Sequence, residues 1–153
     1  MKKSIICITL AAVASGISGA TLAQQKPEDV IKYRKAVMSI QSWHMRPMAA
    51  MVKGQRPFDA EVFAFNAQVI GQTARMKGDA FAPGTAKAPD VESRAKPEIW
   101  SEPEKFKQAL DRFQAEASKL VEASKAGNLD AVRPAFGGVA KACGACHDSF
   151  RTK

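Results

Sequence analysis

The chain has 153 residues, a formal net charge of +8 and only three cysteines. It contains no run of Lys or Arg, no internal repeat and no low-complexity tract. This composition argues against a nucleic-acid partner, and the length indicates one domain with one core.

Residues 1–23 are predicted to form a secretory signal peptide that is removed. Lys2 and Lys3 provide the basic start, an apolar run covers 5–13, and Thr21-Leu22-Ala23 ends in small residues. The apolar run is too short to span a bilayer, so we expect no membrane span. Residues 24–153 would then form a single periplasmic domain. Its two cysteines exclude a disulfide framework if both are used by a cofactor.

The first predicted helix covers residues 28–53, where apolar side chains recur at helical spacing. Pro47 should kink this helix because it lacks a backbone donor, and Gly54 is a plausible stop. The inward face consists of Val30, Ile31, Val37, Met38, Met45, Met48 and Val52.

A second helix is expected to begin after the capping residue Asp59 and to end near Gly78. Its predicted seam consists of Val62, Val69, Thr73 and Met76. Residues 79–97 contain several prolines and are predicted to be one long connection.

The third helix is predicted from Ser101-Glu102-Pro103-Glu104, which has the spacing of a capping box with proline in the first turn. Gly127 is expected to end it. The buried face follows spacings of four and three, through Phe106, Leu110, Phe113, Ala117, Leu120 and Ser124.

The last helix carries apolar residues together with a group of chemically reactive side chains on one face. That face consists of Leu129, Phe136, Val139, Ala140, Cys143, Cys146, His147 and Phe150, with Pro134 suited to the first turn or a kink. Four amphipathic helices and no alternating strand pattern predict an all-α, antiparallel four-helix bundle that encloses a cofactor among its helices.

The run Cys143-Gly144-Ala145-Cys146-His147 reads C-x-x-C-H, the attachment signature of a covalent haem c. Two thiols can form thioethers with the two vinyl groups of one porphyrin, and the histidine can place an imidazole nitrogen on the iron. A thioredoxin-type redox pair would require a strand–helix context, and a structural zinc site requires four ligands. Neither requirement is met by the sequence, so we interpret the motif as a haem site.

Arg34 lies on the inward face of the first predicted helix, where an unpaired guanidinium is costly to bury. A haem propionate would supply the counter-charge through a bidentate contact. The alternative is that Arg34 extends to the bundle end and keeps its charge in water. We favour the propionate interpretation.

Met38 lies one turn after Arg34 on the same face. A methionine there is either a packing residue or, because this helix must face the haem, a sixth iron ligand. His44 is six residues further along and cannot share that face, so we interpret it as a surface or interface residue.

Short segments along nearly the whole of residues 24–153 carry a family resemblance. They are Lys26-Pro27-Glu28-Asp29, Lys32-Tyr33-Arg34, Val52-Lys53-Gly54-Gln55, Phe81-Ala82-Pro83-Gly84-Thr85, Lys96-Pro97-Glu98-Ile99-Trp100 and the run from Cys143 to Arg151. They resemble the class II c-type cytochromes, most closely the cytochromes c′. The resemblance implies a periplasmic, often dimeric four-helix bundle with haem on Cys143 and Cys146 and His147 as proximal ligand. It also implies Arg34 on the propionate side, Arg151 on the proximal side and Met38 at the distal position.

Three functions follow from these observations. The first is a gas-binding haem protein with five-coordinate, His-ligated iron that takes NO or CO, alone or together with electron transfer to a redox partner protein. The second is a low-spin electron carrier with His147 and Met38 as axial ligands. The third is a zinc module on Cys143, Cys146 and His147. No acidic dyad or base–nucleophile pair suggests an enzyme. The overall resemblance favours the first function.

A homodimer is also predicted, because the first two helices carry more apolar side chains than one seam requires. The surplus residues are Ile40, Trp43, Met51, Phe63, Phe65 and Ile70. The alternative is that they pack beneath the long connection.

Overall fold

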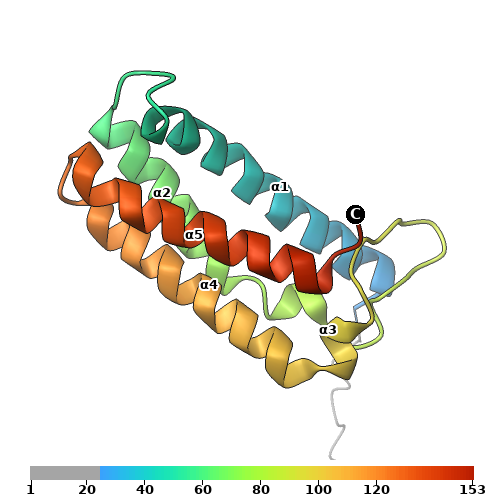
Figure 1. The fold of residues 1–153 in the computed structure, drawn as a ribbon. Coiled ribbons are helices and arrows are strands. Elements are labelled where there is room, and N and C mark those ends of the chain that lie inside the picture. Colours follow the sequence, from blue (N-terminus) through green and yellow to red (C-terminus); the bar gives the residue numbers. More distant parts are fainter. Residues whose placement is uncertain (1–24) are drawn as a thin grey trace, which may run out of the picture.

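Four long helices form the body of the molecule in the computed structural model, which describes residues 25–153 (Figure 1). They are α1 (Pro27–Val52), α2 (Ala60–Arg75), α4 (Pro103–Ser124) and α5 (Leu129–Phe150). The connection between α2 and α4 contains a 3-10 turn, η1 (Asp79–Phe81), and a single-turn helix, α3 (Glu98–Ser101). Within the described range, β-structure is limited to two isolated bridges. The predicted all-α bundle is confirmed, whereas the segment 1–23 lies outside the described residues.

The long helices run alternately up and down and are neighbours in chain order, α1 against α2, α2 against α4 and α4 against α5. Contacts between α1 and α5 close the bundle, and α5 packs chiefly against α4. None of the helices in residues 25–153 combines the length and the apolar character that a bilayer span requires.

Helix ends follow the local sequence at some positions and depart from it at others. Asp59 caps α2 as predicted, since its carboxylate accepts from the Val62 N–H at 3.0 Å. Asn128 caps α5 in the same way through the Ala131 N–H at 3.0 Å, and Gly127 before it has a φ of +64°. The helix α1 continues through Pro47 without a break.

The predicted capping box before α4 is wrong. Ser101 is the last residue of α3, and Glu102 occupies the N-cap position of α4 without a side-chain cap. The physical reason is that residues 97–101 form a helical turn of their own, which buries Ile99 in a small apolar cluster. Pro103 still occupies the first turn of α4, as the sequence predicts.

Two apolar clusters fill the bundle. The larger contains Met48, Met51, Phe63, Ala67, Ile70, Ala74, Phe113, Ala117, Leu120, Val132, Phe136, Val139 and Ala142. The smaller contains Ile99, Phe106 and Phe150, and Phe81 and Trp100 pack against it. The Phe106 ring meets Phe81 and Phe150 edge to face, with centroid distances of 4.8 and 5.2 Å. The smaller cluster lies at the bundle end where α5 finishes.

The face of α2 differs from the prediction. Thr73 is buried as expected, but Val62 and Val69 are only partly buried and Met76 is exposed. The buried positions are instead Phe63, Asn66, Ala67, Ile70, Thr73 and Ala74. The pairs Val62–Phe63 and Val69–Ile70 permit two seams one residue apart, and packing selects the one with the larger side chains. At this seam α2 comes so close to α4 that a Cβ on Gly71 would lie 2.8 Å from Val121 Cγ2.

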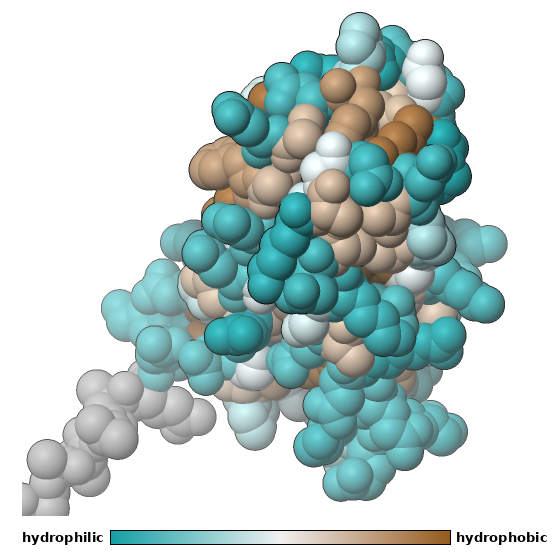
Figure 2. Space-filling model, turned by 90° about the vertical axis from the view of Figure 1, so that its left-hand side faces the viewer, coloured by the Kyte–Doolittle hydropathy of each residue, from teal (hydrophilic) through white to brown (hydrophobic). Residues whose placement is uncertain are grey.

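Apolar side chains outside the seams fall into two groups. Met51, Phe63 and Ile70, predicted as surplus, belong to the larger core, so that prediction is wrong for them. The burial of Phe63 and Ile70 follows from the shift of the α2 face described above, and Met51 is buried on α1. Ile40, Trp43 and Phe65 are exposed as predicted, Trp43 to 69% and Phe65 to 60%. Hydrophobic residues gather in the upper half of the face shown in Figure 2, above a largely hydrophilic lower half.

Candidate haem-binding site

The C-x-x-C-H run lies on the last two turns of α5. Cys143 and Cys146 are one turn apart, and both are free and half-buried. Cys143 packs against the larger apolar cluster and Cys146 against the smaller one. The two sulfur atoms therefore lie at the boundary between the two clusters, on one stripe of the helix. Ala140, which the sequence places on the same face, is exposed.

Burial raises the pKa of both thiols, and the positive charge of Lys77 acts in the opposite direction. Both side chains are therefore held as neutral thiols near pH 7. Neutral, closely spaced thiols on one helical turn suit addition to the two vinyl groups of a single porphyrin.

His147 follows directly after the second cysteine and is exposed, although the sequence places it on the inward face. Loss of hydration, followed by the charges of Arg151 and Lys77, lowers the pKa of its imidazole. A lowered pKa keeps a ring nitrogen unprotonated at neutral pH, which is the form that coordinates a metal. Arg151 is exposed, and its backbone N–H donates to the His147 carbonyl at 3.0 Å. The two residues predicted for the proximal side are thus adjacent.

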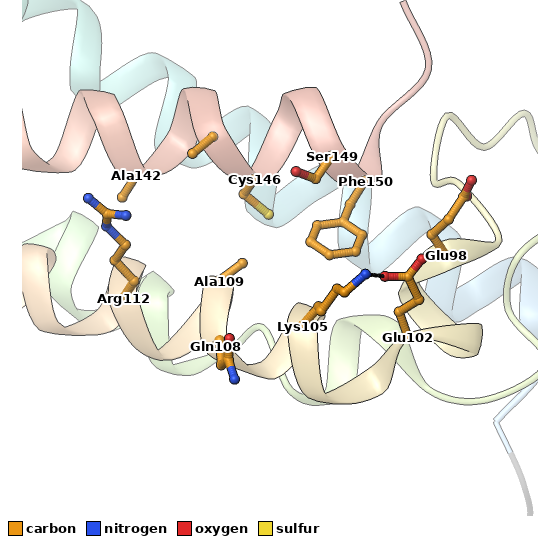
Figure 3. A pocket seen from close by; sticks show the side chains of 11 residues that line it. Glu98, Glu102, Lys105, Gln108, Ala109, Arg112, Ala142, Cys146, Ser149 and Phe150 are labelled. Atoms are coloured by element: carbon orange, nitrogen blue, oxygen red, sulfur yellow. Dashed lines mark ion pairs between the residues drawn. The ribbon is translucent and has the colours of Figure 1, made fainter.

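A groove of about 420 Å³ lies between α4 and α5 beside this turn (Figure 3). Figure 3 shows the Cys146 thiol and the Phe150 ring directed toward α4 across this groove. The outer rim carries charged residues, among them Glu102 and Lys105, which form an ion pair. The groove gives solvent and small molecules access to Cys146.

Arg34 is the most unusual polar residue of the site. It is only 5% exposed, so it does not carry its charge into water. Its Nη2 donates to the Thr85 carbonyl at 2.6 Å, whereas its buried Nη1 has no hydrogen-bond partner. Burial lowers the pKa of this guanidinium, but an arginine remains charged. A buried, charged donor without a partner is costly, and it indicates that a bound group supplies the missing hydrogen-bond acceptor.

Aromatic rings enclose the Arg34 guanidinium. Its carbon lies 5.0 Å from the Phe81 ring centroid and 5.7 Å from that of Trp100. Trp100 is itself fixed, because its indole N–H donates to the carbonyls of Phe81 and Ala82 at 3.1 and 3.0 Å. The guanidinium is thereby held at the bundle end that carries the smaller cluster.

Met38 is half-buried one turn after Arg34 and belongs to neither apolar cluster. Its side chain is therefore not required by the packed core. His44, in contrast, contacts α2, where its Nδ1 lies 2.7 Å from Asn66 Oδ1 and its ring meets Phe65 edge to face. This half-buried position is away from the Arg34 side of the helix, as the spacing predicts.

The sequence analysis did not single out two residues that line this region. Thr85 is buried in the long connection and accepts from Arg34. Lys77 is buried in the turn after α2 and influences the pKa of both cysteines. Thr85 lies in the long connection, where no periodic pattern marks it. Lys77 lies within the predicted second helix, one turn after Thr73 on its seam, but a lysine near a helix end is ordinarily expected in solvent.

The side chains present fit a haem better than a small metal ion. Across residues 25–153, no three His, Cys, Asp or Glu side chains are grouped as a metal ion would require. The zinc hypothesis thus gains no support. Two thiols on one turn, an adjacent imidazole and a buried guanidinium with a free donor match the vinyl groups, iron and propionates of a haem.

Comparisons with known proteins agree with this arrangement. A family model described as Cytochrome C′ matches residues 29–151. Cytochrome c′ of Alcaligenes xylosoxydans xylosoxydans is 41% identical over 128 residues, which cover 84% of this chain and 97% of that protein. A solved structure of cytochrome c′ from Rubrivivax gelatinosus superimposes with a TM-score of 0.79 at 38% identity, covering 84% of this chain and 98% of the other.

Two ligand complexes are also similar to this chain. One is a nitric oxide complex and the other a carbon monoxide complex. Both are of variants of Alcaligenes xylosoxidans cytochrome c′ in which one leucine is replaced. Each matches with a TM-score of 0.76 at 41% identity and covers 84% of this chain and 98% of its own.

Proposed function

Because the chain belongs to the cytochrome c′ family, which binds haem c covalently through cysteines, we propose that it is a gas-binding haem protein. The gases are nitric oxide and carbon monoxide, which relatives of the same family hold in their solved complexes. The observation that carries the proposal is the helical C-x-x-C-H turn at the boundary of the two apolar clusters. Haem iron supplies the gas-binding chemistry, and the residues of this chain hold and orient the haem.

Cys143 and Cys146 are proposed to form the two thioethers, and His147 to coordinate the iron. The α5 turn fixes all three residues, so attachment and coordination are positioned by one rigid element. Arg151 places its charge next to His147 and favours the neutral imidazole. Acid–acetone extraction should leave the colour with the protein, and Cys143→Ala plus Cys146→Ala should abolish attachment. Colour that passes into the solvent would contradict covalent binding.

Arg34 is proposed to bind a haem propionate. Its Nη1 is buried without a partner, and its Nη2 is already occupied by Thr85. A carboxylate oxygen is the acceptor that a charged, buried N–H donor binds most strongly. Thr85, Phe81 and Trp100 then serve to hold the guanidinium in place.

Met38 is proposed to border the sixth coordination position without bonding to the iron. It is half-buried on α1, and a helical side chain has few rotamers with which to direct a lone pair at a metal. The iron would then be five-coordinate and high-spin. Ferrous protein should bind CO readily, and Met38→Ala should keep the spin state and speed CO binding.

Absorption spectra test this proposal against its rival. If the wild type is low-spin and Met38→Ala converts it to high-spin, Met38 is an axial ligand. The chain would then be an electron carrier. Electron transfer to a redox partner protein is compatible with either spin state, and we propose it as an accompanying role. We propose no enzymatic turnover.

We propose export to the periplasm with removal of residues 1–23. Covalent haem attachment in bacteria takes place outside the cytoplasm, which supports export. Mass spectrometry of protein from a periplasmic extract should give a chain that begins near residue 24 and carries one haem. A cytoplasmic, full-length holoprotein would contradict this assignment.

A homodimer through α1 and α2 is the proposed assembly. Ile40, Trp43 and Phe65 expose apolar surface on these two helices. Exposed aromatic residues of this kind often mark an interface. Sedimentation at micromolar concentration should give a dimer, and Trp43→Ser should shift it toward monomer. A wild-type monomer would contradict the assembly.

A further inference from the structure

Lys77 is a buried lysine, and burial lowers the pKa of its amine, whereas the neighbouring Cys143 and Cys146 raise it. It lies in the turn after α2, and its side chain is only 6% exposed. None of the ion pairs within residues 25–153 includes it. Lysine is seldom buried unless it is paired, so this position calls for an explanation beyond ordinary packing.

The amine of Lys77 lies against α4. Its Nζ is 3.9 Å from the centroid of the Phe113 ring on α4, a distance at which the ring face stabilises a cation. On the other side, its charge acts on both cysteines of α5 and on His147. Lys77 therefore directs its charge at the haem-holding turn from a different part of the chain.

Attachment of haem changes which groups respond to the charge of Lys77. Once Cys143 and Cys146 are thioethers, neither sulfur can become a thiolate. The group beside them whose charge still changes is the haem iron, which loses one unit of positive charge when it is reduced. In a poorly solvated interior, a nearby fixed cation favours the less positive state.

We propose that the positive charge of Lys77 shifts the ferrous–ferric equilibrium of the haem iron toward the ferrous state. This inference rests on the proposed haem function. It assigns Lys77 neither a bond to the iron nor a contact with a propionate. Arg34 and Lys77 then have separate roles, since Arg34 binds the cofactor and Lys77 shifts the ratio of ferrous to ferric iron.

The test is a potentiometric titration of the holoprotein. Lys77→Met removes the charge and keeps an unbranched apolar side chain, and Lys77→Arg keeps the charge. Lys125→Met is the matched control, because Lys125 is an exposed lysine at the opposite end of α4 and its loss changes the net charge equally. Haem content is measured in every variant.

At a fixed potential, Lys77→Met should lower the ratio of ferrous to ferric protein about tenfold. That is the order expected for unit charges roughly 10 Å apart at an effective dielectric constant of about 20. A tenfold change corresponds to about 59 mV for one electron. Lys77→Arg and Lys125→Met should stay within about twofold of the wild type. A Lys77→Met ratio within twofold of the wild type overturns the proposal.

A second measurement needs no variant. Lysines of the wild-type holoprotein are acetylated under native conditions, and the modified positions are mapped by mass spectrometry. Lys77 should react much more slowly than Lys125. Equal rates would place the Lys77 amine in solvent and overturn the inference. Protein that carries no covalent haem would instead contradict the proposed function, and that result is seen before any potential is measured.

Discussion

The two ends of the bundle are built on different principles. At the end where α2 and α5 begin, Met48, Phe63, Leu120 and Val132 are completely buried or nearly so, and the core consists of hydrocarbon. At the end where α5 finishes, Arg34 and Lys77 are buried charges, and both cysteines remain half-buried. The first end gains its stability chiefly from apolar burial. The second contains a buried guanidinium N–H that has no acceptor within residues 25–153.

The comparison shows that one fold can separate stability from cofactor binding along its length. Substitutions at the hydrocarbon end should lower the free energy of unfolding and leave the haem spectrum unchanged. Substitutions at the cofactor end should change the spectrum as well. The following predictions test this separation.

The largest effect is expected for Phe63→Ala. Phe63 is fully buried in the larger cluster, and removal of a buried phenyl ring leaves a cavity that costs about 3–5 kcal/mol. Chemical denaturation of the holoprotein measures the loss. Gln68→Ala is the control on the same helix, because this exposed side chain lies outside the proposed dimer interface and should matter by about 0.5 kcal/mol or less. Similar losses for the two variants would contradict the described α2 face.

Arg34→Ala should cost about 1–3 kcal/mol, because a propionate loses its charged partner. Unlike Phe63→Ala, it should also change the haem absorption spectrum. Lys35→Ala is the matched control, since Lys35 is the exposed neighbour on α1. An Arg34 variant with unchanged stability and spectrum would show that the guanidinium does not contact the haem.

Asn128→Ala should destabilise the protein by about 1 kcal/mol, because the Ala131 N–H loses its side-chain acceptor at the start of α5. Asn128→Gly should cost only a few tenths of that amount. The haem is carried at the far end of the same helix, so the spectrum should stay constant. A spectral change would indicate that α5 transmits strain along its length and would weaken the separation of the two ends.

The smallest effect is expected for the pair of exposed Lys119 and half-buried Glu116, whose charged atoms are 2.8 Å apart. Lys119→Ala should change the free energy of unfolding by less than about 0.5 kcal/mol, because solvent screens such pairs. Adding salt should reduce even this difference. A larger, salt-independent loss would mean that the aliphatic part of Lys119 contributes to packing.

The sequence predicted the residues that interrupt a helical apolar pattern and the helix faces that follow one. Arg34 was identified because a charge interrupts an apolar seam, and the face of α4 because its phenylalanines and leucines recur at regular helical spacing. The α2 face was misassigned because adjacent apolar pairs permit two seams. Only contact with α1 and α4 distinguishes them. Lys77 lies one turn after Thr73 on the predicted seam, but it was not identified because a lysine near a helix end is usually solvated.

The long connection is fastened at both ends to the helices that flank the cofactor end. At one end the Arg34 side chain on α1 donates to the Thr85 carbonyl. At the other, Ala95 bridges to Arg151, and the Lys96 N–H donates to the Phe150 carbonyl at 3.0 Å. Only the stretch 86–93 between these attachments is free to change length, and loop closure is a weak function of length. Insertions should therefore accumulate in 86–93 during evolution without displacing the residues around the haem turn.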